Sequence, residues 1–254
     1  MVAHPRPHVS PLSVTDPELI EIFDNFAFDE TLAYSRLEVR IRLMVQLAAL
    51  IACSALTEYL VILEAALDAG VTPVAAKEIV YQAVPYVGMG RVSDFLRATN
   101  DVLTGRGVAL PLEAQSTTTR ETRTAKGRAV QEQVAGAERV RAMHDAAAAD
   151  EAHMQLFLSS NCFGDYLTRG GVDLATRELL TFSMLISLGG ADAQVKGHVA
   201  GNLRVGNTRQ DLLDVVTVLV PFIGYPRSLN ALAAVDEIAP PDLAPDAEPG
   251  REDP

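Results

Sequence analysis

A predominantly apolar run over residues 179–188 is the strongest hydrophobic pattern in the chain. Asp173 precedes it as a candidate N-cap, because its side chain can accept hydrogen bonds from the free N–H groups of a first helical turn. The Gly-Gly pair at 189–190 follows, where the positive φ that ends a helix is readily adopted. A second helix is expected from there to a C-terminal stop at Gly206. The pattern predicts a buried helical hairpin.

Helix-like spacing of apolar residues recurs through the rest of the chain. Asp16-Pro17 and Thr72-Pro73 fit an N-cap followed by proline, and Pro85 is expected to end the helix that contains it. No strand-like alternation of apolar and polar residues occurs. The sequence therefore predicts an all-α fold. Outside the hairpin, helices are expected over residues 16–26, 36–52, 57–69, 73–84 and 91–103, with one broken helix or two over 123–160.

The most informative pattern is an internal repeat. The stretch VPYVGMGR at 84–91 matches VPFIGYPR at 220–227, an offset of 136 residues that also places Gly70 on Gly206. Upstream the offset becomes 137, which places Arg40 on Arg177. Such self-similarity predicts a tandem duplication of about 70 residues, with pseudo-twofold packing of two all-α units.

Two polar residues, Glu178 and His198, lie on apolar faces of the hairpin. They stand 11 and 9 residues from Gly189, so at ~1.5 Å per residue they are nearly level. Packed helices lie about 8 to 10 Å apart, a gap that a carboxylate and an imidazole span together. The first repeat has Ile41 and Ile62 at the matching positions. The pair fits either proton-transfer chemistry or a satisfied structural contact, and the sequence leaves both interpretations open.

Composition narrows the class of protein. The chain has 254 residues, a formal net charge of −12 and no stripe of Lys and Arg, which argues against a nucleic-acid surface. No run approaches the ~20 apolar residues of a membrane span, and the N-terminus lacks a signal-peptide pattern. We therefore expect a cytoplasmic protein whose partners are small molecules or copies of itself.

The two cysteines, Cys53 and Cys162, form no CxxC motif and no Cys/His spacing suited to zinc. A disulfide framework is thus excluded and no metal site is expected.

The expected organisation has five parts. Residues 1–30 form an N-terminal arm, extended over 1–15, and a short helix; 31–105 form a degenerate first repeat, and 106–160 a linker with connecting helices. The second repeat spans 161–238, and 239–254 form a disordered acidic tail.

The stretch from Phe163 to Leu232 resembles the carboxymuconolactone decarboxylase family. The shared features are Phe163-Gly164, Arg169, TRELLT at 176–181, the histidine of VKGH and the IGYPR turn. The first repeat looks like the degenerate leading half of the tandem-domain members. The resemblance implies two alkylhydroperoxidase D-like helical domains in one chain. Family members associate as trimers or hexamers, so a tandem chain would be similar to a homotrimer with pseudo-sixfold packing.

For function, the resemblance implies a carboxy-lyase: a cofactor-independent enzyme that decarboxylates or isomerises a small cyclic carboxylic acid or lactone. In this interpretation His198 is the general acid/base, Glu178 orients or protonates it, and Arg177 or Arg169 binds the substrate carboxylate. Arg177 recurs as Arg40 in a repeat without the other groups, so it also fits a structural ion pair.

Two alternatives remain open. Alkylhydroperoxidase D, of the same family, uses a CxxC followed four residues later by His, with an upstream Glu. Glu178 and His198 match the Glu and the His, but the cysteine positions fall at Gly190 and about Ala193. A thiol-dependent peroxidase or redox protein would therefore have to act through Cys53. The other alternative is a non-catalytic oligomer that binds a small molecule.

Overall fold

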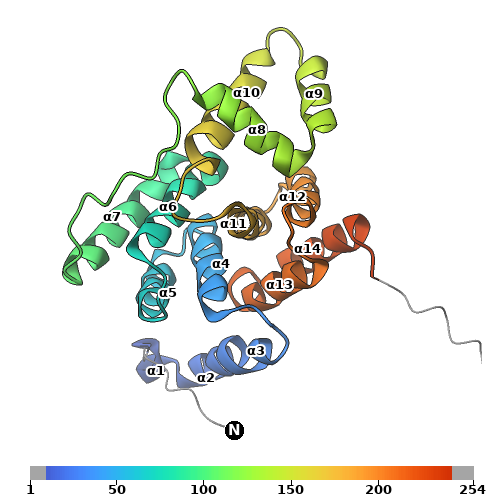
Figure 1. Cartoon of the computed structure of the whole chain (residues 1–254). Coiled ribbons are helices and arrows are strands. Elements are labelled where there is room, and N and C mark those ends of the chain that lie inside the picture. The colour runs from blue at the N-terminus through green and yellow to red at the C-terminus, as the bar shows by residue number, and fades with distance from the viewer. Residues whose placement is uncertain (1–9, 242–254) are drawn as a thin grey trace, which may run out of the picture.

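The computed structural model of the protein describes residues 10–241, and that range contains helices and no β-strand (Figure 1). The all-α fold predicted from the sequence is confirmed. Each repeat contributes four consecutive helices. In the first repeat they are α4 (Val39–Ala52), α5 (Leu56–Asp68), α6 (Pro73–Val87) and α7 (Met89–Gly105). In the second they are α11 (Leu174–Leu188), α12 (Asp192–Arg204), α13 (Arg209–Ile223) and α14 (Tyr225–Ile238).

The two repeats share one hydrophobic core. Helices α4 and α11, the first of each repeat, pack against each other at the centre (Figure 1). Each also packs against the third helix of the other repeat, so that α4 contacts α13 and α11 contacts α6. These reciprocal contacts give the chain the pseudo-twofold arrangement expected of a duplication.

The predicted helix ends are largely confirmed. The Asp173 carboxylate accepts a 2.9 Å hydrogen bond from the Thr176 N–H at the start of α11, and the Thr72 hydroxyl accepts a 3.1 Å bond from the Ala75 N–H at the start of α6. Gly189 follows α11 with a φ of 72°, a left-handed conformation that glycine adopts without a Cβ clash. These caps fix where the second-repeat hairpin turns.

The prediction that Pro85 ends its helix is wrong, because α6 continues to Val87. Proline lacks an N–H, so the helix loses one backbone hydrogen bond at this position. The last turn nevertheless closes, since the Gly88 N–H donates a 2.9 Å hydrogen bond to the Val84 carbonyl. Pro221 lies inside α13 in the same way. The consequence for the site is that Tyr86 is held on a helix rather than a loop.

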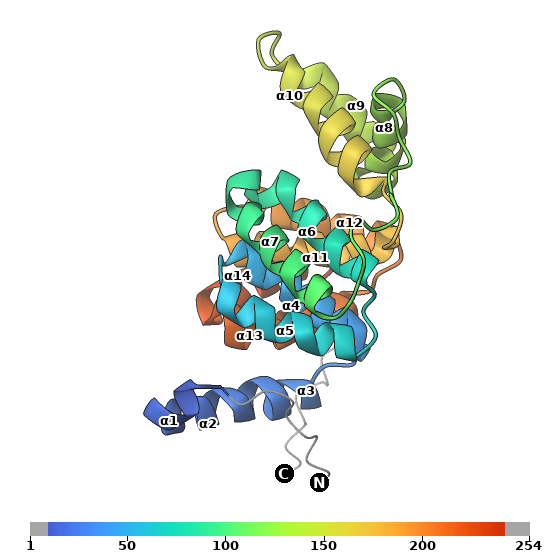
Figure 2. The ribbon, with the colours of Figure 1, turned by 90° about the vertical axis from the view of Figure 1, so that its left-hand side faces the viewer.

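The segment between the repeats folds into α8 (Arg123–Ala135), α9 (Ala137–Ala146), α10 (Ala152–Phe157) and the π-helical η2 (Leu158–Leu167). They project from one end of the molecule (Figure 2). Helix α8 packs tightly on η2 at Gly127, where a Cβ would lie only 2.0 Å from the Ser159 carbonyl oxygen. Helix α8 also packs against α12, the helix that carries His198.

At the N-terminus the chain forms α1 (Leu12–Thr15), α2 (Pro17–Asn25), the π-helical η1 (Phe26–Glu30) and α3 (Thr31–Ala33). The predicted extended arm is therefore wrong over 12–15. The start of that arm, residues 1–9, and residues 242–254 of the predicted acidic tail lie outside the described residues. Phe23 of α2 meets Phe222 of α13 edge to face, with ring centroids 5.7 Å apart. Within residues 10–241, the helices are all too short or too polar to cross a bilayer.

Candidate functional site

Glu178 and His198 meet across the second-repeat hairpin. His198 Nδ1 lies 2.8 Å from Glu178 Oε2, so the contact expected from their positions along the two helices is observed. The Glu178 side chain is fully buried, whereas 17% of the His198 side chain remains exposed. An ionised carboxylate only accepts hydrogen bonds, so in a pair with ionised Glu178 the donor is His198 Nδ1–H and Nε2 is the ring nitrogen that remains. In the described chain no residue hydrogen-bonds His198 Nε2.

Asn202 braces this pair from one turn further along α12. Its buried side-chain amide donates hydrogen bonds to the Glu178 carbonyl at 3.1 Å and to the His198 carbonyl at 2.7 Å. The absence of a side chain at Gly201 lets the helices approach: a Cβ there would lie 2.9 Å from Glu178 Oε2 and 2.9 Å from Val134 Cγ1. The pair is thus held by α12 on one side and α8 on the other.

A tyrosine from the other repeat completes the surroundings of the pair. The Tyr86 ring, on α6, stands edge to face with the His198 ring at a centroid distance of 6.1 Å. Glu178 Oε1 is buried and has no hydrogen-bond partner in the described chain, and the polar neighbours of the buried Tyr86 hydroxyl are Thr181 and Cys162. Burial raises the pKa of Tyr86 well above its usual value, and the nearby Cys162 and Glu178 raise it further. Tyr86 is therefore a neutral phenol at physiological pH.

The Arg177 guanidinium binds acceptors inside the protein. Its side chain is 1% exposed and donates hydrogen bonds to Glu78, Gln82 and three backbone carbonyls. Its Nε and Nη2 donors are all engaged and one Nη1–H bonds Gln82, so a single buried Nη1–H remains. Burial lowers the pKa of Arg177, while Glu78 opposes that effect. Of the two roles expected for Arg177, the ion pair is observed, with Glu78.

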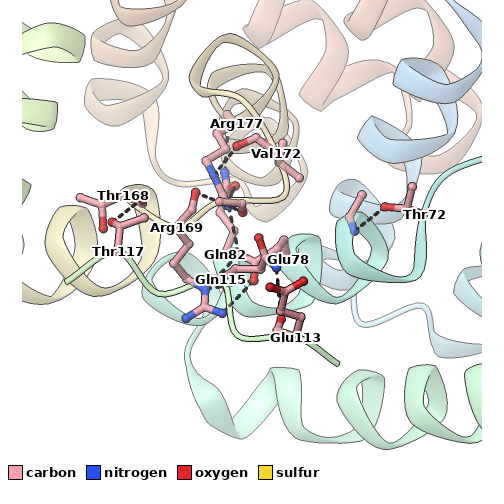
Figure 3. Close-up of polar contacts among 12 residues, drawn as sticks. Thr72, Glu78, Gln82, Glu113, Gln115, Thr117, Thr168, Arg169, Val172 and Arg177 are labelled. Atoms are coloured by element: carbon pink, nitrogen blue, oxygen red, sulfur yellow. Dashed lines mark hydrogen bonds and ion pairs between the residues drawn. The ribbon is translucent and has the colours of Figure 1, made fainter. Parts of the chain in front are cut away.

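Arg169 shares the Glu78 carboxylate with Arg177, as Figure 3 shows. Its Nε and Nη2 donate to Glu78 at 2.8 to 3.0 Å. Unlike Arg177, Arg169 is partly exposed, and its Nη1 has no hydrogen-bond partner among the described residues. Arg169 can therefore bind an anion without giving up Glu78.

Neither cysteine has the surroundings of a reactive thiol. Cys53 Sγ lies 3.8 Å from the Ser187 carbonyl oxygen and 3.8 Å from Arg227 Nη1. Burial raises its pKa, although Arg227 and Arg91 oppose that effect. Burial raises the pKa of Cys162 to about 12. Both are free cysteines, and both are protonated near neutral pH, whereas the nucleophile of thiol chemistry is the thiolate.

Sequence reasoning missed Tyr86, Glu78 and Gln82. The repeat contained a signal for Tyr86: the matching residue in the second copy is Phe222, so the two copies differ there by one hydroxyl group. For Glu78 and Gln82 the signal was polar residues in the otherwise apolar helix 73–84. Nothing local indicated that their partner, Arg177, lies 99 and 95 residues away.

The fold and the site together define a class: an all-α chain with two alkylhydroperoxidase D-like helical repeats, in which only the second repeat carries the Glu–His pair. The model of the carboxymuconolactone decarboxylase family matches residues 17–101 and again residues 152–237. The two matches cover more than half of the chain, so the chain belongs to the carboxymuconolactone decarboxylase family. No curated protein matches it significantly.

Proposed function

We propose that this protein is an enzyme that moves a proton to or from a small cyclic carboxylic acid or lactone, in a decarboxylation or an isomerisation that needs no cofactor. The observation that carries the proposal is the 2.8 Å contact between His198 Nδ1 and the fully buried Glu178. Such a carboxylate orients the imidazole and stabilises its protonated form, while Nε2 stays available to a substrate.

In a decarboxylation, the bond between the ring carbon and the carboxylate breaks and CO2 leaves. The electron pair stays on the ring carbon, which then takes the Nε2 proton of a His198 imidazolium and leaves a neutral imidazole. In an isomerisation, Nε2 removes a proton from one carbon and returns it to another. In either route Glu178 stabilises the imidazolium of His198. Tyr86 is a neutral phenol beside Glu178 and His198, and its O–H can donate a hydrogen bond to a developing negative charge.

Arg169 is the residue that we assign to the substrate carboxylate. It lines a cavity of about 420 Å³ that also contains Lys126 of α8 and the apolar side chains Val130 and Leu174. Val130, Leu174 and Tyr86 all pack against one small apolar cluster, which consists of Val134, Phe163 and Leu167. This cavity therefore offers two cations for a carboxylate and an apolar wall for a ring, and His198 itself is not part of its lining.

The test is a screen of small cyclic carboxylic acids and carboxylated lactones for CO2 release and for isomerisation in D2O. We expect turnover of at least one compound, with one deuterium per product where a proton is delivered. The variant Tyr86→Phe should lower kcat while the protein stays folded. An absence of turnover across the panel, with ligand binding intact, would favour the non-catalytic alternative.

We also propose that the chain assembles as a homotrimer. Large apolar side chains are exposed on α2, at Leu19 and Ile22, and on α14, at Tyr225 and Leu229. A second copy would remove such side chains from water. One chain has a mass of 27.2 kDa. Sedimentation equilibrium should give three times this mass, and a mass equal to that of one chain would contradict the trimer.

A further inference from the structure

A second, larger cavity lies on the first repeat, away from the Glu178–His198 pair. It has a volume of about 650 Å³ and lies between α6, α7 and the connecting segment 110–115. The segment is held in place where the Gly170 N–H donates a 2.9 Å hydrogen bond to the Gln115 carbonyl. Figure 3 shows Arg169, Gln115 and Glu113 gathered at this place, beside Glu78.

Two cations flank one aromatic ring inside this cavity. Lys77 Nζ lies 5.3 Å from the centre of the Tyr81 ring, and the Arg169 guanidinium lies 5.1 Å from the same centre. Lys77 is only 9% exposed, and its ammonium donates a 2.5 Å hydrogen bond to Asn100 Oδ1. Both cations line the cavity.

The lining itself is balanced, with Lys77 and Arg169 against Glu78 and Glu113, and the excess positive charge comes from the buried Arg177 behind Glu78. The buried Glu78 carboxylate is shared between Arg169 and Arg177. Lys77 has no carboxylate within ion-pair distance in the described chain. A buried cation without a counter-ion is costly, so an anion that enters the cavity gains more than it would at an exposed lysine. The remaining carboxylate on the lining, Glu113, lies on the exposed segment and faces the same cavity.

We propose that this cavity is a binding site for a small organic monoanion, whose carboxylate lies between Lys77 and Arg169. The apolar body of the ligand packs on Tyr81, Val74 and Leu112, which line the same space. A flat carboxylate suits the guanidinium of Arg169 through paired N–H donors, and its ring suits the face of Tyr81. This site and the proposed substrate cavity share Arg169, which borders both, but in the described chain no residue of this site hydrogen-bonds His198 or Glu178.

The experiment is calorimetric titration of the full chain with benzoate, a probe that has one carboxylate and one flat apolar ring. A dissociation constant of about 1 mM or lower is expected for a ligand of this size in a cavity with two cations. Lys77→Met should weaken binding by about tenfold or more, and Lys77→Arg should largely restore it. Glu113→Gln should tighten binding, because it removes a like charge.

Lys126→Met is the matched control, since Lys126 lines the other cavity that Arg169 borders. It should leave benzoate binding at the Lys77 site unchanged, and so should His198→Ala. The proposal is overturned if benzoate does not bind, if Lys126→Met abolishes binding while Lys77→Met does not, or if inorganic phosphate binds more tightly than benzoate.

A crystal soaked with 4-bromobenzoate decides the matter if Lys77→Met fails to fold. Anomalous density for bromine between Tyr81 and segment 110–115 would support the site, and bromine elsewhere would contradict it. Because these measurements need no turnover, a failure here leaves the proposed enzyme activity standing, and an absence of turnover leaves this site standing.

Discussion

Arg177 of the second repeat donates a 3.0 Å hydrogen bond to Glu78 of the first, although 99 residues separate them. Both side chains are almost completely buried. The contact therefore joins the two repeats inside their common core. It also engages the guanidinium of this arginine inside the core.

The matched pair Arg177→Met and Arg40→Met tests this role. Removal of one partner from a buried ion pair leaves the other charge uncompensated, so Arg177→Met should lower the free energy of unfolding by about 3 to 5 kcal/mol. Arg40 holds the corresponding place in the first repeat, but its side chain is exposed and pairs with Glu38 at the surface. Arg40→Met should therefore cost less than about 1 kcal/mol. Urea unfolding of both variants measures the difference, and equal losses would contradict the assignment.

Local signals allowed the hairpin to be predicted from sequence. Asp173 and Gly189 mark the two ends of α11, and the lengths of the two helices place Glu178 level with His198. The repeat allowed the pseudo-twofold core to be predicted in the same way. The partners of Arg177 could not be predicted, because Glu78 and Gln82 reach it only after the repeats pack. The position of Tyr86 beside His198 depends on the same long-range packing.

Gly201→Ala should disturb the Glu–His pair although neither residue is replaced. The added Cβ would lie 2.9 Å from Glu178 Oε2 and from Val134 Cγ1, so α12 must move and stability should fall by about 1 to 3 kcal/mol. Gly197→Ala on the same helix is the control, because its Cβ would lie 3.4 Å from the flexible end of Arg139. There the higher helix propensity of alanine should stabilise by about 0.5 to 1 kcal/mol. Thermal melts that rank the two variants in the opposite order would contradict the packing described.

Cys162 should make the protein less stable in alkaline solution. Its pKa is raised from 9.0 to about 12 by burial, so above pH 9 the unfolded chain loses the thiol proton before the folded chain does. The contribution of this group is complete below pH 9 and decreases as pH rises toward 12, by about 1.4 kcal/mol per pH unit. Cys162→Ala should flatten the dependence of unfolding free energy on pH by that amount. An unchanged slope would mean that the thiol is accessible to water.

Cys53 should not support peroxidase turnover. Burial raises its pKa, and no second cysteine is paired with it. Dithiol-driven reduction of hydroperoxides should therefore be weak or absent. Peroxidase assays on the wild type and on Cys53→Ser measure this directly. Robust activity that Cys53→Ser abolishes would replace the proposed proton-transfer function by the thiol mechanism.

The central claim is that the Glu178–His198 pair performs chemistry in the second repeat, and the first repeat supplies its control. Ile62 occupies the position that corresponds to His198 and is 4% exposed in the core. Ile62→Ala should therefore lower stability by about 2 to 5 kcal/mol, with little effect on kcat. His198→Ala removes the general acid/base and should lower kcat by about 10² to 10⁴ fold.

The most direct measurement compares kcat and the thermal melt for His198→Ala and Ile62→Ala, with a substrate found in the screen. Folded His198→Ala should lose turnover, and its melt should fall because the buried Glu178 carboxylate loses its partner, whereas Ile62→Ala should melt early while its remaining folded fraction keeps full turnover. If folded His198→Ala instead retains its activity, the pair is a structural contact and the proposed function is contradicted.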